Sequence, residues 1–564
     1  MAKLNGVEGK AHVESKDGLS NWRGYIILLP DLANLRHFDI AGPTAKGVYE
    51  GPVIMGGKCY FMKGNVRVRK VAFSQSELRV EFVGNGEINI IHPLSIVPDD
   101  YLPLEQMKLN IHTQAIQKFN ERGLSVLSLC KESNSQESIQ TKAVRFPEMY
   151  TSGTITNKDI IGEIELGLRD RTGKQIGRYF THQKKQIGLE EDSYINFTKL
   201  CESIQKAIKP PMVISQAAVE NQVFEWVRDR FCGNTQAELV EYILPRLEAK
   251  IEELEVWVPI AELRVESDVQ IGYILIRPIT EEDINQWRDE RLSHIKDKEK
   301  DNVSEFFGEK FKKKFQGWPA GIIKITAEPI AAREIALHET ERSLAMLRVF
   351  SVAALTPKIT CYSAVMGQEN YETTTTFTFK NNLFTSYNQN TVDRGQEPWN
   401  LDRESVTKVF ETGLGILSEL LRKTTITEFQ KSILDSLTLY SQATSEKDLS
   451  NKLVYLFAAL EGILLKNDTE PIQQNLGERI ATLIGRDLKD KKDIIKNIKT
   501  TYGLRSRFLH HAYTIDDYSE LENFMYNAWR AMNIVINNHD RFATKEDFVS
   551  AVDDQKLAPR HSSE

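Results

Sequence analysis

Short runs of alternating hydrophobic and polar residues make the first hundred positions β-rich. Three such runs are Gly24–Leu29, Val66–Val71 and Leu78–Val83, and turn formers such as Gly84–Gly86 separate them. Side chains of a strand point alternately to its two faces, so this period-two pattern between turns predicts β-strands. We therefore expect residues 1–105 to form a β-rich domain, either a small sandwich or a barrel.

The middle of the chain mixes the two hydrophobic periods. Apolar residues at helical spacing predict helices at Ala217–Arg230 and Thr235–Glu252. Compact apolar runs predict strands at Glu163–Leu168, Glu255–Ile260 and Ile271–Ile276. The pattern indicates a mixed α+β domain over residues 106–290.

Helical periodicity dominates the second half. Residues 291–424 are interpreted as a linking and mostly helical region, with a helix at Ala331–Phe350 and a strand at Thr373–Phe379. From Arg403 almost to Asn538 the pattern is helical, interrupted by polar turns at 442–447, 466–470 and 486–490. We expect an all-α domain at 425–540, followed by a flexible tail at 541–564. The predicted fold class is therefore multidomain α+β.

Composition bounds the class of protein. A chain of 564 residues is too long for one core, so three or four domains are expected. The net charge of −7 gives no global attraction to nucleic acid, so any RNA contact needs a local basic patch. The five scattered cysteines argue against disulfides or a zinc site, and no run is long enough to span a bilayer. These features predict a cytoplasmic protein without a membrane partner.

Candidate chemistry lies near the C-terminus, in the segment Tyr502–Tyr513. Arg505 and His510 stand there at R-x4-H spacing. About forty residues earlier, Glu461 lies at the edge of an apolar helical stripe, where a carboxylate is costly without a partner. One interpretation is a structural role, in which Glu461 caps a helix or bridges to Arg479 or a lysine.

The helix containing Ala459-Leu460-Glu461, followed by the R-x4-H motif, resembles the HEPN family of small helical RNA-cutting domains. Within that family it is similar to the ApeA-like abortive-infection branch. The resemblance covers roughly residues 425–540. It implies a helical bundle, an ion pair between Glu461 and the motif Arg505, a homodimer with two motifs at its interface, and a role in antiviral defence.

Cleavage of RNA without a metal ion needs two groups at the scissile phosphate. Histidine suits the proton transfer from the 2′-hydroxyl, because its pKa lies near neutrality. Arginine suits the phosphate, because its planar guanidinium holds two oxygens at once. We therefore assign His510 and Arg505 these roles, with a 2′,3′-cyclic phosphate as the product and no metal or other cofactor.

The five-residue spacing of the motif conflicts with a site on a single helix. Five residues of an α-helix turn a side chain by about 140°, so Arg505 and His510 would face different sides. A kink, a frayed helix end or a dimer partner must bring the two groups together. Of these, the resemblance favours the dimer.

Two alternatives to this assignment stay open. Arg505 and His511 form R-x5-H, and with Tyr513 they are similar to HEPN toxins whose tyrosine is modified by a partner enzyme. His511 is therefore an alternative catalytic residue, and Tyr513 is a candidate modification site. The second alternative is a non-catalytic HEPN module for dimerisation or RNA binding, in which Arg505 and His510 are structural.

Local charge around the motif favours RNA as the partner. Residues 487–511 hold seven Lys or Arg and three Asp, a net of +4 in a chain of net −7. Candidate RNA-binding residues are Lys492, Lys496, Lys499 and Arg507. The alternative is an ordinary solvated helix face. We expect the preceding residues to act as a sensor or regulator for a phage-derived or nucleic-acid trigger.

Overall fold

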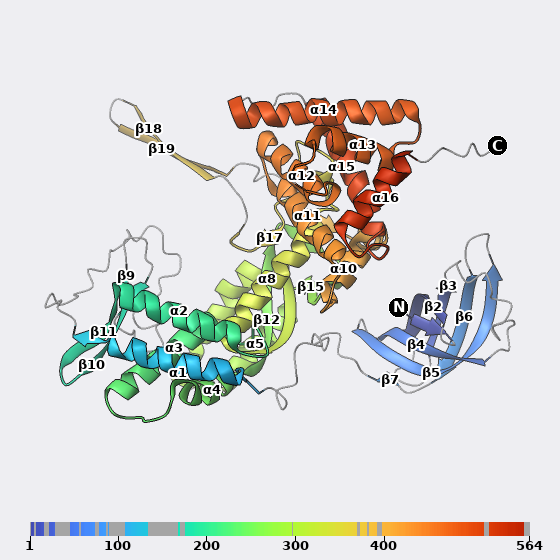
Figure 1. The fold of residues 1–564 in the computed structure, drawn as a ribbon. Coiled ribbons are helices and arrows are strands. Elements are labelled where there is room, and N and C mark those ends of the chain that lie inside the picture. Colours follow the sequence, from blue (N-terminus) through green and yellow to red (C-terminus); the bar gives the residue numbers. More distant parts are fainter. Residues whose placement is uncertain are drawn as a thin grey trace. The chain divides into compact units, whose positions relative to one another are not determined.

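The computed structural model describes most of the second half of the chain and parts of the first. The described residues are 2–4, 7–15, 22–28, 46–55, 58–73, 78–85, 88–89, 108–132, 167–169, 175–295, 297–368, 373–380, 383–391, 398–467, 469–511 and 518–557. The chain divides into two compact units, Met1–Val97 and Pro98–Glu564 (Figure 1).

The first unit is a seven-stranded sheet, so the β-rich prediction is confirmed. Its strands are β1 (Ala2–Leu4), β2 (Val7–Ser15), β3 (Trp22–Leu28), β4 (Lys46–Met55), β5 (Lys58–Phe73), β6 (Leu78–Asn85) and β7 (Ile88–Asn89). The order is β1-β4-β2-β3-β6-β5-β7, and β4 also pairs with β5. Because β4 joins both β2 and β5, the sheet closes on itself as a barrel does.

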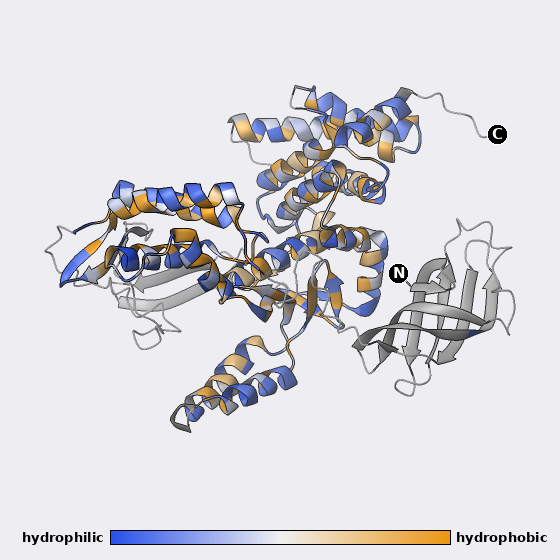
Figure 2. Cartoon of the chain, turned by 60° about the horizontal axis from the view of Figure 1, so that its bottom comes forward, coloured by the Kyte–Doolittle hydropathy of each residue, from blue (hydrophilic) through white to orange (hydrophobic). Residues whose placement is uncertain are grey.

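The second unit begins with four helices beside a small sheet. The helices are α1 (Thr113–Ser128), α2 (Glu191–Ala207), α3 (Gln216–Phe231) and α4 (Leu239–Glu248). The strands are β8 (Lys131–Glu132), β9 (Gly167–Arg169), β10 (Gln175–His182) and β11 (Lys185–Glu190). Trp226, Phe197 and Phe224 are buried in the core that these helices share. Figure 2 shows hydrophobic residues along one side of these helices and hydrophilic residues along the other.

Two predicted elements of this part differ from the structure, and a third is described only in part. The helix predicted at Thr235–Glu252 is shorter, because residues from Glu252 onward belong to a strand. The strand predicted at Ile271–Ile276 is a hairpin, since Gly272 adopts a positive φ of 57° and reverses the chain. Of the strand predicted at Glu163–Leu168, residues 163–166 lie outside the described residues.

An antiparallel five-stranded sheet forms the centre of the second unit. Its strands are β12 (Glu252–Ala261), β14 (Val269–Ile271), β15 (Ile274–Pro278), β16 (Pro319–Ala327) and β17 (Ala364–Val365), in the order β14-β15-β16-β12-β17. Smaller pairs join β13 (Leu263–Val265) to β20 (Trp399–Leu401) and β18 (Thr373–Lys380) to β19 (Leu383–Thr391). The strand predicted at Thr373–Phe379 is thereby confirmed.

The predicted division at residue 290 does not match this sheet. Strand β16 lies in the region predicted to be linking and mostly helical, yet it is the central strand of the sheet. Its apolar run packs under helix α8 (Pro329–Arg348), which confirms the helix predicted at Ala331–Phe350. The charged segment before β16 forms helices α5 (Glu281–Ser293), α6 (Asp297–Glu305) and α7 (Lys312–Phe315).

The C-terminal part is helical, as predicted. Its helices are α9 (Arg403–Val409), α10 (Gly415–Arg422), α11 (Glu428–Ser445), α12 (Leu449–Leu464), α13 (Ile472–Ile484), α14 (Leu488–His511), α15 (Tyr518–Asn537) and α16 (Lys545–Leu557). These helices share one hydrophobic core with the central sheet and α8, so the boundary predicted at residue 424 does not separate two cores. In the described part of the chain, no helix is both long and apolar enough to cross a membrane.

The flexible tail predicted at 541–564 is wrong for Lys545–Leu557. Those residues form α16, whose Phe548, Val549 and Val552 are buried against the other helices. Phe548 stacks on Phe429 of α11 at a ring-centroid distance of 4.9 Å. Residues 558–564 lie outside the described residues.

Helix α16 is expected to stabilise the helical part measurably. Phe548→Ala should lower its free energy of unfolding by about 3–5 kcal/mol, because it removes a buried ring and leaves a cavity. Urea unfolding followed by far-UV circular dichroism measures the change. The matched control is Gln555→Ala on the exposed side of α16, which should change it by less than about 0.5 kcal/mol. Equal stability of both variants would contradict the packing role of α16.

Candidate functional site

Helices α12 and α14 position the residues of the predicted motif. Asp448 caps the start of α12 by accepting a hydrogen bond from the Asn451 backbone N–H at 2.9 Å. Helix α14 lies along the outside of the helical part (Figure 1) and buries one stripe of its surface. That stripe consists of Ile494, Asn497, Ile498, Thr501 and Leu504. The remaining sides of α14 are largely exposed.

A polar contact fixes α14 against α15. Buried Asn497 donates from Nδ2 to the backbone oxygen of Glu520 at 2.9 Å and to its carboxylate at 2.8 Å. Asn527 of α15 donates to Asn497 Oδ1 at 3.3 Å. These bonds satisfy a buried amide and resist rotation of α14 about its axis. Sequence reasoning missed Asn497, whose only signal is a polar residue on the apolar stripe.

Glu461 of α12 pairs with Arg505 of α14. Arg505 Nη1 lies 3.1 Å from Glu461 Oε1, and the two side chains are 17% and 22% exposed. The arginine partner that the resemblance implied is therefore the one present. The alternative partner, Arg479, is buried and occupied elsewhere, by Glu470 at 2.7 Å and Asp553 at 2.9 Å.

Two aromatic rings complete the surroundings of Arg505. Its guanidinium carbon lies 5.8 Å from the ring centroid of Phe457 and 5.5 Å from that of Tyr502. Cation–π attraction at such distances adds roughly 0.5–2 kcal/mol, depending on how far the cation is desolvated. The sequence carried a signal for Phe457, since it stands one helical turn before Glu461.

The ion pair leaves polar atoms unsatisfied. Among the described residues, neither Glu461 Oε1 nor Arg505 Nε has an aligned hydrogen-bond partner, although both atoms are buried. Burial raises the pKa of Glu461 above its ordinary value, and the charge of Arg505 lowers it. The carboxylate therefore depends on Arg505 for its charged state. Arg505 Nε therefore keeps an N–H donor that no described residue accepts.

The outward face of α14 carries the predicted RNA-binding lysines. Lys492, Lys496 and Lys499 are exposed, and their spacing places them on one side of the helix. Position 510 follows Lys492 by eighteen residues, which is about five full turns, so it falls on the same side. Arg507 is also exposed, next to this stripe.

Gly503 leaves room in the middle of this face. Apart from residues 502–504 and the neighbouring backbone of α14, no described atom lies within 4 Å of the point where a Cβ of residue 503 would stand. A phosphate backbone or a second helix can therefore approach α14 closely at that position. Sequence reasoning did not single out Gly503, because a glycine inside a helix has no chemical signature of its own.

Arg505 and position 510 both lie on helix α14. Helix α14 extends to His511, so the two residues are about 140° apart around its axis. Arg505 faces α12, whereas position 510 falls on the lysine side. The side chains of His510 and His511, and the whole of Tyr513, lie outside the described residues.

The described part of the chain offers no metal-binding cluster. Among the described residues, no three His, Cys, Asp or Glu side chains cluster in a way that could hold a metal ion. Comparisons with protein-family models, with curated proteins and with solved structures found no match for this chain.

The Glu461–Arg505 pair should show strong energetic coupling. In a double-mutant cycle with Glu461→Gln and Arg505→Met, we expect a coupling of roughly 1–3 kcal/mol, because each single change leaves a largely buried partner alone. Hydrogen exchange of α12 and α14 measures the local free energy of opening. The exposed Lys431–Asp435 pair on α11, at 3.0 Å, is the matched control and should couple by about 0.5 kcal/mol or less. Equal coupling in both pairs would contradict the structural importance of the Glu461 pair.

Stability of the Arg505→Met variant should fall as pH rises. Without Arg505 only burial acts on Glu461, so its folded-state pKa lies above the unfolded value near 4.5. Between the unfolded and the folded pKa, the folded chain binds more protons than the unfolded chain. The free energy of unfolding therefore falls as the pH rises through the folded pKa. Hydrogen exchange across that window, with Glu461→Gln/Arg505→Met as the pH-insensitive control, measures this. A rise in stability over the same window would refute the assignment of the shift.

Proposed function

We propose that this protein is a metal-independent endoribonuclease of the HEPN type. The observation that carries the proposal is the Glu461–Arg505 ion pair between α12 and α14. It places an oriented arginine one and a half turns from a histidine on a helix with a basic outer face. Such a combination suits phosphate binding and proton transfer at a single scissile bond.

In this proposal RNA lies along the outer face of α14. Lys492, Lys496 and Lys499 follow the phosphate backbone, and the open space at Gly503 lets the strand approach the helix. His510 takes the proton of a 2′-hydroxyl, and the oxygen then attacks the adjacent phosphorus. The 5′-oxygen leaves with a proton, so the products are a 2′,3′-cyclic phosphate and a 5′-hydroxyl.

Arg505 contributes through the donors that Glu461 does not use. Glu461 holds Nη1, which orients the guanidinium and leaves Nε with no aligned partner among the described residues. A phosphate oxygen that reaches Arg505 would find a preorganised cation, and such preorganisation lowers the cost of stabilising the transition state.

The 140° offset between Arg505 and position 510 supports a homodimer in this proposal. Two copies of α14 that pack along the side of Arg505 and Leu509 can bring the histidine of one copy towards the arginine of the other. Leu509 stands four residues after Arg505 on the same side of α14 and is 52% exposed, so it offers the second copy an apolar contact. The preceding part of the chain then senses a phage-derived or nucleic-acid trigger in antiviral defence.

A non-catalytic module for dimerisation or RNA binding is the second candidate. The specific observation in its favour is that Arg505 already has a carboxylate and two aromatic rings around it. Such an arginine can serve packing alone. This candidate keeps RNA binding on the lysine face and predicts that no bond is cut.

Cleavage assays on labelled RNA in EDTA separate these candidates. The wild-type protein should cut RNA and leave cyclic phosphate ends. His510→Ala should lower the rate by about 10²–10⁴-fold with RNA affinity retained, because general acid–base catalysis acts in the transition state. Arg505→Ala should lose both rate and affinity, since its cation contacts phosphate in both states.

Two control variants in the same assay test which histidine is catalytic and whether the lysines of α14 bind RNA. His511→Ala should keep most activity, and Lys492→Ala/Lys496→Ala/Lys499→Ala should weaken RNA binding and flatten its salt dependence. Activity lost only in His511→Ala would move catalysis to R-x5-H and make Tyr513 the residue to examine by intact mass. RNA binding without cleavage under any trigger would favour the non-catalytic module.

A further inference from the structure

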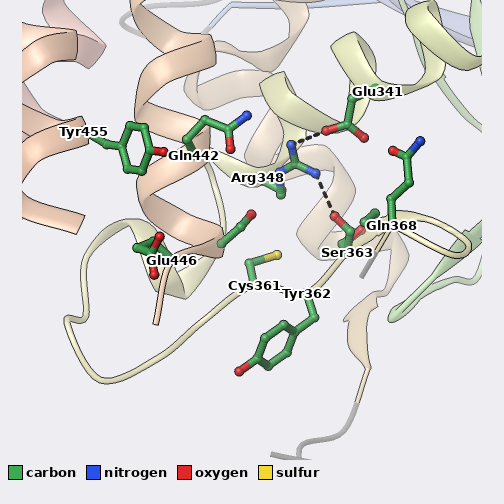
Figure 3. A pocket seen from close by; sticks show the side chains of 11 residues that line it. Glu341, Arg348, Cys361, Tyr362, Ser363, Gln368, Gln442, Glu446 and Tyr455 are labelled. Carbon is green, nitrogen blue, oxygen red and sulfur yellow. Dashed lines mark hydrogen bonds and ion pairs between the residues drawn. The ribbon is translucent and has the colours of Figure 1, made fainter. Parts of the chain in front are cut away.

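A cavity of about 410 Å³ lies where the C-terminal helices meet α8 and the loop leading into β17. Figure 3 shows Gln442 of α11 and Tyr455 of α12 on one side of the cavity and Gln368 on the other. Arg348 and Glu341 of α8 lie between them, beside Ser363 of the loop. The volume falls within the range of about 300–1,000 Å³ that is usual for small-molecule sites.

The loop that forms one wall is held from several sides. Buried Lys452 of α12 donates from Nζ to the backbone oxygens of Pro357 and Ile359, both at 2.9 Å. The backbone N–H of Cys361 donates to Thr444 of α11 at 2.8 Å. These bonds tie the loop to two helices, so the wall is formed before any ligand arrives.

Arg348 organises the floor of the cavity. It is buried and donates to Ser441 Oγ and to the backbone oxygen of Ser363, each at 2.9 Å, and to Glu341 Oε1 at 2.6 Å. Each of the three guanidinium nitrogens thus donates to an acceptor of the protein. It neutralises Glu341 and shapes the site rather than presenting a free positive charge.

Two buried polar atoms at this cavity lack partners among the described residues. They are Oε2 of Glu341 and Oγ of Ser363, a residue that is only 1% exposed. An unsatisfied buried polar atom costs about 1–3 kcal/mol, so a ligand that meets these atoms gains from their satisfaction. Glu341 needs a donor, whereas the serine hydroxyl can donate or accept.

The charge of the lining disfavours anions. Glu341 and Glu446 supply two negative charges and Arg348 one positive charge, which gives a net formal charge of −1. Burial raises the pKa of the Cys361 thiol, so this cysteine stays protonated and offers no nucleophile. The cavity therefore has the character of a binding site for a neutral molecule rich in hydrogen-bonding groups.

We propose that this cavity binds a neutral nucleoside. The side-chain amide of Gln442 presents a donor and an acceptor side by side, and so does that of Gln368 on the opposite side. Such a pair of groups matches the edge of a base. Glu341 Oε2 accepts from an amino group or hydroxyl of the ligand, and Ser363 Oγ pairs with a further group. The Tyr455 side chain lines the same side as Gln442.

A ligand in this cavity would also contact α12, the helix that carries Glu461. Tyr455 precedes Glu461 by six residues of α12, about 9 Å along the helix axis. A nucleoside between α8, α11 and α12 would therefore stabilise the arrangement of the helices around the candidate active site. The binding proposal itself does not depend on RNA cleavage.

Isothermal titration of the full chain with adenosine, guanosine, cytidine and uridine tests the proposal. At least one nucleoside should bind saturably, and its 5′-monophosphate should bind more weakly because the lining is negatively charged. Gln442→Arg, which brings a bulky cation into the cavity, should weaken binding by about tenfold or more. The matched control is Gln286→Arg, an exposed glutamine on α5 outside the cavity lining, and it should leave binding unchanged.

Three results would overturn the proposal. They are no saturable heat with any of the four nucleosides, equal loss of binding in Gln442→Arg and Gln286→Arg, and tighter binding of the monophosphate or of inorganic phosphate. Thermal unfolding of both variants without ligand shows whether they are folded. If Gln442→Arg does not fold, Gln368→Arg on the opposite wall replaces it in the same titration.

Discussion

The rotation of α14 about its own axis is the constraint on which the candidate site depends. Glu461 of α12 holds Arg505 inward, and Asn497 holds the same helix against α15. Because an α-helix turns about 100° per residue, these contacts leave Lys492 and position 510 on the outward side. The inward Glu461–Arg505 ion pair thus fixes which side of α14 is exposed, and that side carries the lysines.

The helical part and the central sheet behave as one body in this account. Their buried residues form a single core that extends from Val258 to Val552, with α8 packed between the sheet and α11. A change at the sheet can therefore reach α11 and α12 through packed side chains. The nucleoside cavity lies at that junction, where a small ligand would contact both parts.

The sequence predicted an element best where the apolar spacing within one segment is sufficient to identify it. The helices from α8 to α15 follow from apolar spacing within each segment, and Glu461 showed its need for a cation by lying on an apolar edge. Strand β16 and helix α16 were missed for different reasons. The run in β16 is short and apolar, which does not distinguish a strand from a buried helix, and α16 has little amphipathic pattern.

Features that depend on tertiary contact left no sequence signal. The cavity joins Glu341, Ser363 and Gln442, which stand 22 and 79 residues apart along the chain and belong to no motif. Likewise, only the family resemblance favoured Arg505 over Arg479 as the partner of Glu461. Their separate roles follow from packing, since Asp553 of the unexpected α16 engages Arg479.

Photocrosslinking of RNA to the full chain is the measurement that tests this account most directly. RNA that carries 4-thiouridine is irradiated with the His510→Ala protein, and the crosslinked peptides are identified by mass spectrometry. The account predicts crosslinks on α14 between Lys492 and Arg507, with few on the buried stripe that contains Ile498 and Thr501. Crosslinks confined to other parts of the chain, with α14 unlabelled, would contradict it.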